Sequence, residues 1–339
     1  MKVADYIANF VAEKGVRYIH TIMGGGAATL NDSFGKHPDL KYVPYHSEAG
    51  ASYAAFGEAK FTNQVAIINP TTGIAGVNAM AGVLSAWQDS APVLIISGNV
   101  PVAQTTLNTQ MKKGVSPRQV GIQENNINAL VGPITKANYF LLEAERVREI
   151  LEEAFSLCME GRKGPVWVDI PADIAATEIN PDELKGLPTI IPFCRLHKDE
   201  YVQKVVRKIL GSDAPLVLAG NGIHTSNTRE EFGRFIEKYN FPVVTTFLGV
   251  DLLPEYDLNI GRIGIKGNRA ANFALQNCDK LLVLGSCLNM SHIGYLPDTF
   301  AGGAEIISVD IDENRTTLVK ENVIKRDLRD FFKLCEQIG

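Results

Sequence analysis

The sequence of 339 residues predicts an α/β fold with two doubly wound domains, in which parallel sheets are flanked by helices. Short apolar runs alternate with segments of helical period along most of the chain. Glycine turns follow several of these runs, as at the βα connections of parallel sheets. A stretch rich in Pro and Asp separates two such alternations, and 45% hydrophobic content is enough for two cores.

The first alternation predicts one domain over residues 1–175. Its expected strands are 18–23, 41–45, 65–69, 92–97 and 166–170. Its expected helices are 3–14, 49–60, 73–87, 122–131 and 145–161. The polar segment 104–118 has no periodicity, which fits an active-site loop and a solvated surface loop equally well.

The second alternation predicts a Rossmann-like domain over residues 197–339, joined to the first by a linker at 176–196. Its expected strands are 216–219, 242–246, 280–284 and 305–310, and its expected helices are 200–210, 228–239, 269–277 and 328–337. Glycines follow these strands at Gly220, Gly222, Gly264, Gly267 and Gly285. Such turns hold dinucleotides in some folds and are plain βα connections in others.

Composition excludes several classes of protein. The formal net charge is −5, and the lack of basic runs argues against a nucleic-acid partner. The N-terminus interleaves charged and apolar residues, unlike a signal peptide, and no apolar run is long enough to span a membrane, so we expect a cytoplasmic protein. The five cysteines are scattered without metal-ligand spacing, which predicts structural thiols and no metal site.

Glu48 is the candidate functional centre, because it stands where the strand 41–45 gives way to a helix of small residues. The simplest interpretation is an acid stabilised by the dipole of a helix start. However, an ionised Glu is seldom buried without a partner, and no Lys or Arg lies within four residues of Glu48. A buried, unpaired Glu has a raised pKa and can exchange a proton with a bound heterocycle.

Four stretches add a more specific signal. They are 72–78 (TGIAGVN), 86–98 (AWQDSAPVLIISG), the pair Gln123-Glu124 ahead of 133–136 (PITK), and 164–171 (GPVWVDIP). In this order they resemble the N-terminal and central domains of thiamine diphosphate-dependent enzymes of the acetolactate synthase type. The resemblance covers nearly the whole chain.

The resemblance implies the roles of individual residues. Glu48 matches the Glu that hydrogen-bonds the aminopyrimidine ring of thiamine diphosphate and promotes removal of the thiazolium C2 proton. Gln123 matches a glutamine on the substrate side of the cofactor, whereas the sequence alone also fits a helix cap at this position. The expected contacts to the cofactor are Gly25, Glu48, Thr72, Gly73 and Asn78.

Relatives also carry a third domain, in which a Gly-Asp-Gly motif followed by an Asn pair binds Mg²⁺ and the cofactor diphosphate. No Gly-Asp-Gly occurs in this sequence. We therefore expect the diphosphate-binding domain to be absent and the chain alone to be inactive. Mg²⁺ and the diphosphate site would come from the rest of a longer enzyme or from a separate polypeptide. FAD, which the central domain of some relatives carries, is a less favoured cofactor.

The expected function is therefore that of a transferase or lyase that decarboxylates a 2-keto acid and ligates the product to an acceptor. We expect at least a homodimer, in which the small faces of helices 49–60 and 73–87 pack across a two-fold axis. Two alternatives remain. One is a non-catalytic regulatory or scaffold subunit that retains the fold, and the other is an NAD- or FAD-binding module.

Overall fold

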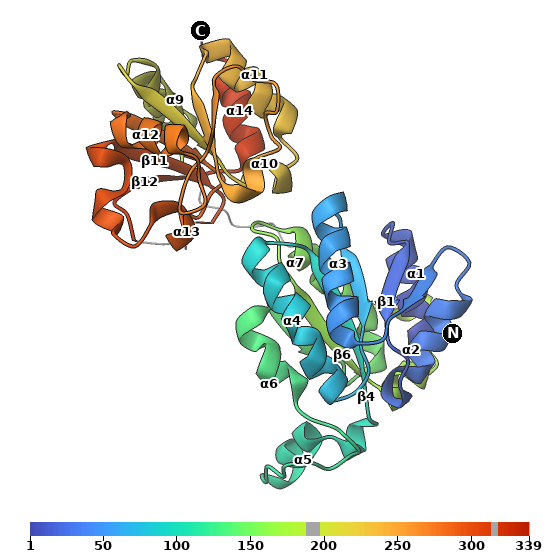
Figure 1. Cartoon of the computed structure of the whole chain (residues 1–339). Coiled ribbons are helices and arrows are strands. Elements are labelled where there is room, and N and C mark those ends of the chain that lie inside the picture. Colours follow the sequence, from blue (N-terminus) through green and yellow to red (C-terminus); the bar gives the residue numbers. More distant parts are fainter. Residues whose placement is uncertain (188–196, 313–317, 339) are drawn as a thin grey trace. The chain divides into compact units, whose positions relative to one another are not determined.

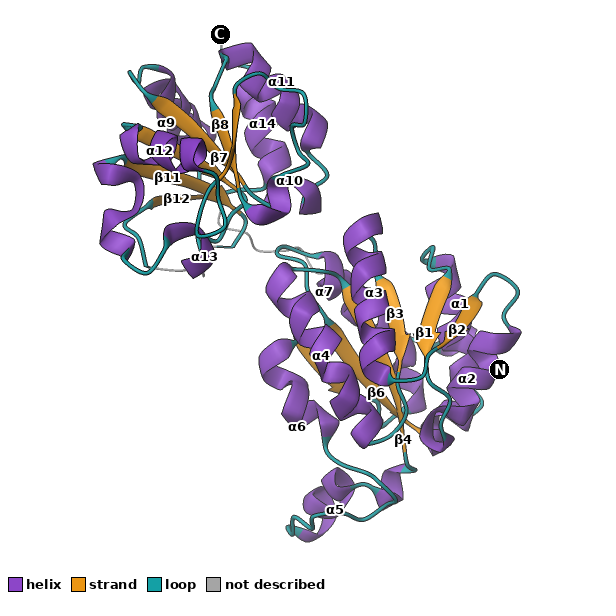
Figure 2. Cartoon of the chain, viewed as in Figure 1, coloured by secondary structure: helices purple, strands orange, loops and turns teal. Residues whose placement is uncertain are grey.

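The computed structural model describes residues 1–187, 197–312 and 318–338 (Figure 1). The chain divides into two compact units, Met1–Ile191 and Pro192–Gly339. Each unit contains one six-stranded sheet in which all paired strands are parallel, with helices on both faces (Figure 2). The predicted fold class is therefore confirmed.

In the first unit the strands follow the order β2-β1-β3-β4-β6-β5. These strands are β1 (Tyr18–Thr21), β2 (Lys41–Pro44), β3 (Ala66–Asn69), β4 (Val93–Asn99), β5 (Ala137–Phe140) and β6 (Val166–Pro171). The helices are α1 (Val3–Glu13), α2 (Ala28–Lys36), α3 (Glu48–Thr62), α4 (Ile74–Asp89), α5 (Thr106–Lys113), α6 (Ile127–Val131), α7 (Val147–Met159) and α8 (Ala172–Ala176).

Alternate residues of the central strands enter two different cores. Ile67 packs with residues of α1, α2 and α7, whereas its neighbour Ile68 packs with residues of α3, α4 and α6. Trp167 of β6 lies in the second core and is fully buried. Since successive side chains of a strand point to opposite faces, a central strand that is buried on both sides reads as a continuous apolar run.

In the second unit the strands follow the order β12-β11-β10-β7-β8-β9. These strands are β7 (Pro215–Ala219), β8 (Val243–Thr245), β9 (Asn259–Arg262), β10 (Lys280–Leu284), β11 (Glu305–Asp310) and β12 (Asn322–Lys325). The helices are α9 (Asp199–Leu210), α10 (Gly222–Thr225), α11 (Arg229–Tyr239), α12 (Arg269–Asn277), α13 (Met290–Ile293) and α14 (Leu328–Glu336).

Three strands were not predicted, and all three are edge strands: β5, β9 and β12. Their residues are mostly half-buried, so their sequences lack the apolar run that marks a central strand. The segment 104–118, predicted as a loop, contains the helix α5, which buries none of its residues. The helix predicted over 122–131 is wrong in its first half, since α6 begins only at Ile127.

The beginning of the predicted linker belongs to the first unit. The backbone N–H of Val3 donates to the carbonyl of Thr177, that of Ile179 donates to the carbonyl of Met1, and Leu184 is buried. The backbone N–H of Leu187 donates to the Glu152 carboxylate at 2.6 Å. Residues 176–187 are therefore fastened to the first unit, and 188–196 lie outside the described residues.

Candidate active site

Glu48 is the first residue of α3, immediately after the capping residue Ser47, whose hydroxyl accepts from the backbone N–H of Gly50 at 3.1 Å. The expectation of a buried, unpaired carboxylate is wrong. Glu48 is only partly buried, and the side-chain amide of Asn78 donates a hydrogen bond of 2.7 Å to its Oε2. The partner was missed because Asn78 comes from another helix, α4, and not from the four residues on either side.

Helices α3 and α4 bring these two residues together by close packing. A Cβ added to Gly82 would lie 2.4 Å from Ser52 Oγ and 2.5 Å from the Ser52 carbonyl carbon. The hydroxyl of Ser52 also accepts from the backbone N–H of Gly82 at 3.2 Å. Gly82 therefore allows α3 and α4 to pack closely within one subunit. Gly76, in the first turn of α4, instead faces Ile127 and Trp167.

Gly73 and Gln123 meet beside the start of α4. Gly73 precedes this helix with φ +67°, and a Cβ there would lie 1.5 Å from the carbonyl oxygen of Gln123. Gln123 itself has φ +58°, in the left-handed region, and is exposed. The helix-cap interpretation of Gln123 is therefore wrong, because Asn126 caps α6 instead, accepting from the backbone N–H of Ala129.

Thr72 lies next to the glycine turn that follows β1. Its side chain is buried, and within the described part of the chain its Oγ1 has no hydrogen-bond partner. A Cβ on Gly26 would lie 1.8 Å from that oxygen, and a Cβ on Gly24 would lie 2.3 Å from Thr71. Gly25 between them is exposed, with nothing within 4 Å of an added Cβ. The outer glycines thus allow close packing, while the Gly25 backbone faces open space.

The predicted site residues follow the carboxyl ends of neighbouring parallel strands. Gly25 follows β1, Glu48 follows β2, and Thr72 and Gly73 follow β3. The structure joins them in pairs, Glu48 with Asn78 and Gly73 with Gln123, and it packs Thr72 against the glycine turn. Ligands of open α/β sheets bind at this edge.

Sequence reasoning missed a buried amide network that supports the glycine turn. The side-chain amide of Asn31 donates to Asn69 Oδ1 at 2.5 Å, and that of Asn69 donates to the carbonyl of Ile96 at 2.6 Å. The Thr21 hydroxyl donates to the carbonyl of Asn69 at 2.8 Å. Because buried amides must be satisfied together, this network holds β1, α2, β3 and β4 in one arrangement.

A second unpredicted group lies beside the segment leading to Glu48. His20 of β1 is buried between the Tyr45 hydroxyl, 2.9 Å from its Nδ1, and the Glu58 carboxylate, 2.6 Å from its Nε2. Burial, with a smaller effect of the Glu58 charge, raises the pKa of Tyr45. No spacing in the sequence relates these three residues.

A third unpredicted group surrounds Asp169 of β6, which is buried. Ser97 Oγ donates to its carboxylate at 2.5 Å and Asn99 Nδ2 at 2.7 Å, while Trp167 Nε1 donates to Ser97 Oγ at 2.7 Å. Burial raises the pKa of Asp169 to about 6, against the opposing effect of the Ser97 and Asn99 hydrogen bonds, and the charge of Glu124 raises it further. Perturbed carboxyl groups of this kind are common at functional sites.

The post-strand glycines of the second unit pack against one another. A Cβ on Gly220 would lie 2.3 Å from the carbonyl oxygen of Gly285, and one on Gly222 would lie 2.5 Å from the Gly285 Cα. Gly285 has φ +61° and accepts from the backbone N–H of Gly222 at 2.8 Å. The loops that follow β7 and β10 approach each other closely, and this contact accounts for Gly220, Gly222 and Gly285 without a bound nucleotide.

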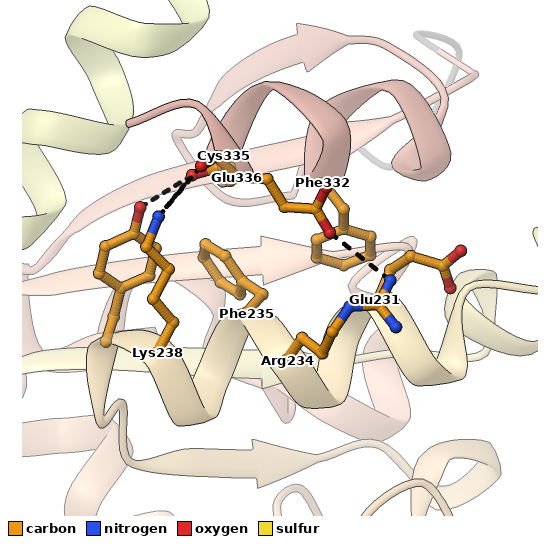
Figure 3. A pocket seen from close by; sticks show the side chains of 8 residues that line it. Glu231, Arg234, Phe235, Lys238, Phe332, Cys335 and Glu336 are labelled. Atoms are coloured by element: carbon orange, nitrogen blue, oxygen red, sulfur yellow. Dashed lines mark hydrogen bonds and ion pairs between the residues drawn. The ribbon is translucent and has the colours of Figure 1, made fainter. Parts of the chain in front are cut away.

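A pocket of about 220 Å³ opens between α11 and α14 of the second unit (Figure 3). Phe235 and Phe332 line it together with charged residues. Lys238 Nζ donates to the carbonyl of Ile338 at 2.7 Å, and Arg234 lies 3.5 Å from Glu336. Lys238 therefore satisfies carbonyl groups at the C-terminal end of α14, and we interpret the pocket as part of the packing of α11 against α14.

Within the described ranges, no group of three or more His, Cys, Asp and Glu side chains has the arrangement of a metal site. Cys158, Cys278, Cys287 and Cys335 are free thiols, and Cys194 lies outside the described residues. Burial raises the pKa of Cys158 to about 12, as expected of an unreactive structural thiol. No helix among the described residues is long and apolar enough to cross a membrane.

Comparison with known families matches both units. Residues 1–124 match the model described as "Thiamine pyrophosphate enzyme, N-terminal TPP binding domain", and residues 202–332 match "Thiamine pyrophosphate enzyme, central domain". These ranges contain all six predicted site residues.

Individual relatives agree. The acetolactate synthase large subunit of Lactococcus lactis is 32% identical over 316 residues, covering 91% of this chain and 52% of that protein. A probable acetolactate synthase large subunit of Methanocaldococcus jannaschii is 30% identical over 318 residues, covering 92% and 51%. A chloroplastic acetolactate synthase of Arabidopsis thaliana is 30% identical over 320 residues, covering 92% and 45%. The chain spans about half the length of these relatives. It belongs to the thiamine pyrophosphate enzymes and comprises an N-terminal cofactor-binding domain and a central domain of the acetolactate synthase type.

Proposed function

We propose that this chain forms the pyrimidine-binding and central part of a cytoplasmic enzyme that decarboxylates a 2-keto acid and ligates the product to an acceptor. The observation that carries the proposal is the position of the Glu48 carboxylate at the N-terminus of α3. This carboxylate accepts a hydrogen bond from Asn78 and is partly exposed to solvent. A carboxylate held in this way can take up and return a proton.

The residues present fit the pyrimidine end of thiamine diphosphate. Glu48 offers a carboxylate, Thr72 a buried hydroxyl that no described residue hydrogen-bonds, and Gly25 a backbone that faces open space. A heterocycle that carries both donor and acceptor groups can satisfy the Thr72 hydroxyl, which would otherwise remain a buried unpaired group. When bound, the cofactor supplies the electron sink for decarboxylation.

In this proposal the protein contributes proton control and position. Asn78 holds one oxygen of Glu48, which leaves the other oxygen for the pyrimidine ring. Gln123, held beside Gly73, faces the 2-keto acid. Mg²⁺ and the diphosphate would be held by residues outside these two domains, either elsewhere on the same polypeptide or on a separate one.

We further propose that the first unit pairs with a second copy through the outer faces of α3 and α4. Phe61 is 94% exposed, and Tyr53, Ile74, Val77 and Leu84 are also large, apolar and exposed. The small faces that we expected at this interface are instead used within the subunit, where Ser52 meets Gly82. Light scattering should return a dimer, and Phe61→Glu should weaken it, whereas a monomer at micromolar concentration would contradict the pairing.

Replacement of Glu48 by Gln tests the proposal directly. In the catalytically complete enzyme, we expect Glu48→Gln to slow hydrogen–deuterium exchange at the cofactor C2 by about two orders of magnitude, as for loss of a general acid–base group. Ser47 still caps α3 in the variant, so the fold should be retained. Unchanged exchange would reduce Glu48 to a helix-start acid, and wild-type protein that never accelerates the exchange would favour the scaffold alternative.

A further inference from the structure

Glu124, the neighbour of Gln123, has the most unusual side chain at this edge of the first sheet. It is 4% exposed, and its Oε1 accepts two hydrogen bonds from Thr106, one from the backbone N–H at 2.8 Å and one from the hydroxyl at 2.7 Å. Its Oε2 is buried and has no hydrogen-bond partner among the residues that the structure describes. A carboxylate buried with only half of its acceptors used is unfavourable unless it has a specific role.

The two hydrogen bonds fasten the base of a projecting segment, which we call the α5 arm (residues 102–121). The helix α5 buries none of its residues, and Figure 1 shows it standing away from the sheet. The ends of the arm meet at its base, where a Cβ on Gly121 would lie 2.9 Å from the carbonyl oxygen of Gln104. Glu124 comes three residues after Gly121 and accepts hydrogen bonds from Thr106, the first residue of α5. It therefore links the start of α5 to the segment that leads on to α6.

The residue between this base and the start of α4 is Gln123. Its left-handed backbone places its carbonyl oxygen against Gly73, in a space that no side chain at position 73 can share. A non-glycine residue remains in this region only where its surroundings enforce it. Asn126, not Glu124, caps α6, whereas Glu124 accepts from the first backbone N–H of α5 and so binds the start of the projecting helix.

Glu124 also affects a neighbouring buried acid. A second buried carboxyl group, Asp169, lies close enough for the charge of Glu124 to act on it. Two buried carboxylates oppose one another, and a neutral Gln at position 124 would still offer an oxygen to Thr106.

We propose that Glu124 is a positioning residue: it holds Gln123 in its left-handed conformation against Gly73 and fixes the base of the α5 arm beside the substrate. The role of Gln123 at the substrate rests on the function proposed above.

Amide hydrogen exchange of the 339-residue protein tests the structural half. Glu124→Ala should accelerate exchange in peptides covering 104–126 by at least tenfold, and Thr106→Val, which removes one of the two donors, by a smaller factor. The matched control is Thr109→Val on the same helix, whose hydroxyl bonds only the carbonyl of Thr105 at 3.2 Å and whose loss should leave Gln123 unchanged. Wild-type exchange in Glu124→Ala would overturn the proposal.

Activity of the catalytically complete enzyme tests the functional half. Glu124→Ala should lower keto-acid turnover at least tenfold while C2 exchange on the cofactor stays within twofold, because Glu48 and Asn78 are untouched. Glu124→Gln should restore most of the turnover and should not destabilise the first unit. Equal loss of turnover and of C2 exchange would show a general structural defect and would refute the positioning role. If the wild-type enzyme has neither activity, the proposed function fails, and the exchange data still decide whether Glu124 holds Gln123.

Discussion

Asn78 of α4 donates a 2.7 Å hydrogen bond to Glu48, which begins α3, and the two residues are 30 positions apart. The same separation of 30 recurs one helical turn later, where the backbone N–H of Gly82 donates to the hydroxyl of Ser52. The two helices therefore run in the same direction in a fixed register. That register depends on a glycine, because a Cβ at position 82 would lie 2.4 Å from Ser52 Oγ.

This register predicts the effect of replacing Asn78. Asn78→Ala removes the donor that orients the carboxylate, and we expect cofactor C2 exchange about tenfold slower, a smaller loss than for Glu48→Gln, because one hydrogen bond is worth roughly 1 kcal/mol. Ser85→Ala is the control, since the Ser85 hydroxyl bonds only the carbonyl of Ala81 in its own helix. If Asn78→Ala and Ser85→Ala had the same rate of cofactor C2 exchange, Asn78 would not orient Glu48.

The contact between Gly73 and Gln123 predicts a large loss of stability from a single methyl group. Gly73→Ala introduces a Cβ 1.5 Å from the Gln123 carbonyl oxygen at φ +67°, and we expect the first unit to lose roughly 2–4 kcal/mol in urea unfolding. Gly57→Ala in α3 is the matched control, because an added Cβ there meets nothing within 4 Å. It should gain up to about 1 kcal/mol from helix propensity. Equal stability of the two variants would show that the backbone at Gly73 relaxes freely.

The raised pKa of Asp169 predicts how the stability of the first unit depends on pH. Asp169 has a pKa of about 6 in the folded protein, above the ordinary value of 3.8, so the folded state binds more protons than the unfolded state between about pH 4 and 6. This group therefore lowers the free energy of unfolding as the pH rises through that window, by roughly 3 kcal/mol in total.

Asp169→Asn removes this titration. The free energy of unfolding of the variant minus that of the wild type should therefore rise between pH 4 and pH 7, by roughly 3 kcal/mol. Urea unfolding at each pH measures this difference. The emission of Trp167, which is buried and donates to Ser97 beside Asp169, provides a local signal. Parallel pH profiles of the two proteins would show that Asp169 does not titrate in this window.

The site also predicts weak binding of thiamine diphosphate to these two domains alone. Hydrogen bonds from Glu48 and Thr72 are worth about 1 kcal/mol each, while association costs at least several kcal/mol. The described residues also include no acidic cluster for Mg²⁺ beside the diphosphate. Calorimetry with cofactor and Mg²⁺ should therefore show affinity no better than about millimolar. Micromolar, Mg²⁺-dependent binding would reveal a diphosphate site in this chain, and recovery of binding with a separate diphosphate-binding polypeptide would support a split enzyme.

The sequence was sufficient for the central strands and most of the helices. Strands such as β3 and β4 are buried on both faces and read as apolar runs. The edge strand β5 is half-buried along its length, and its sequence does not distinguish it from a loop. For the same reason α5 was missed, because a helix that buries no face has no apolar period to detect.

The sequence by itself determined the two-domain α/β architecture, because burial pattern and motif order are local properties of a chain, and it indicated a set of candidate site residues. Only the tertiary structure decided which residues lie against one another, and it added residues that were not predicted. The hydrogen bond from Asn78 to Glu48, the contact of Gly73 with Gln123, and the buried acid Glu124 bound to Thr106 each join residues 18 to 50 positions apart. Such contacts depend on the register of packed helices and on left-handed turns, and that register is set by the fold as a whole.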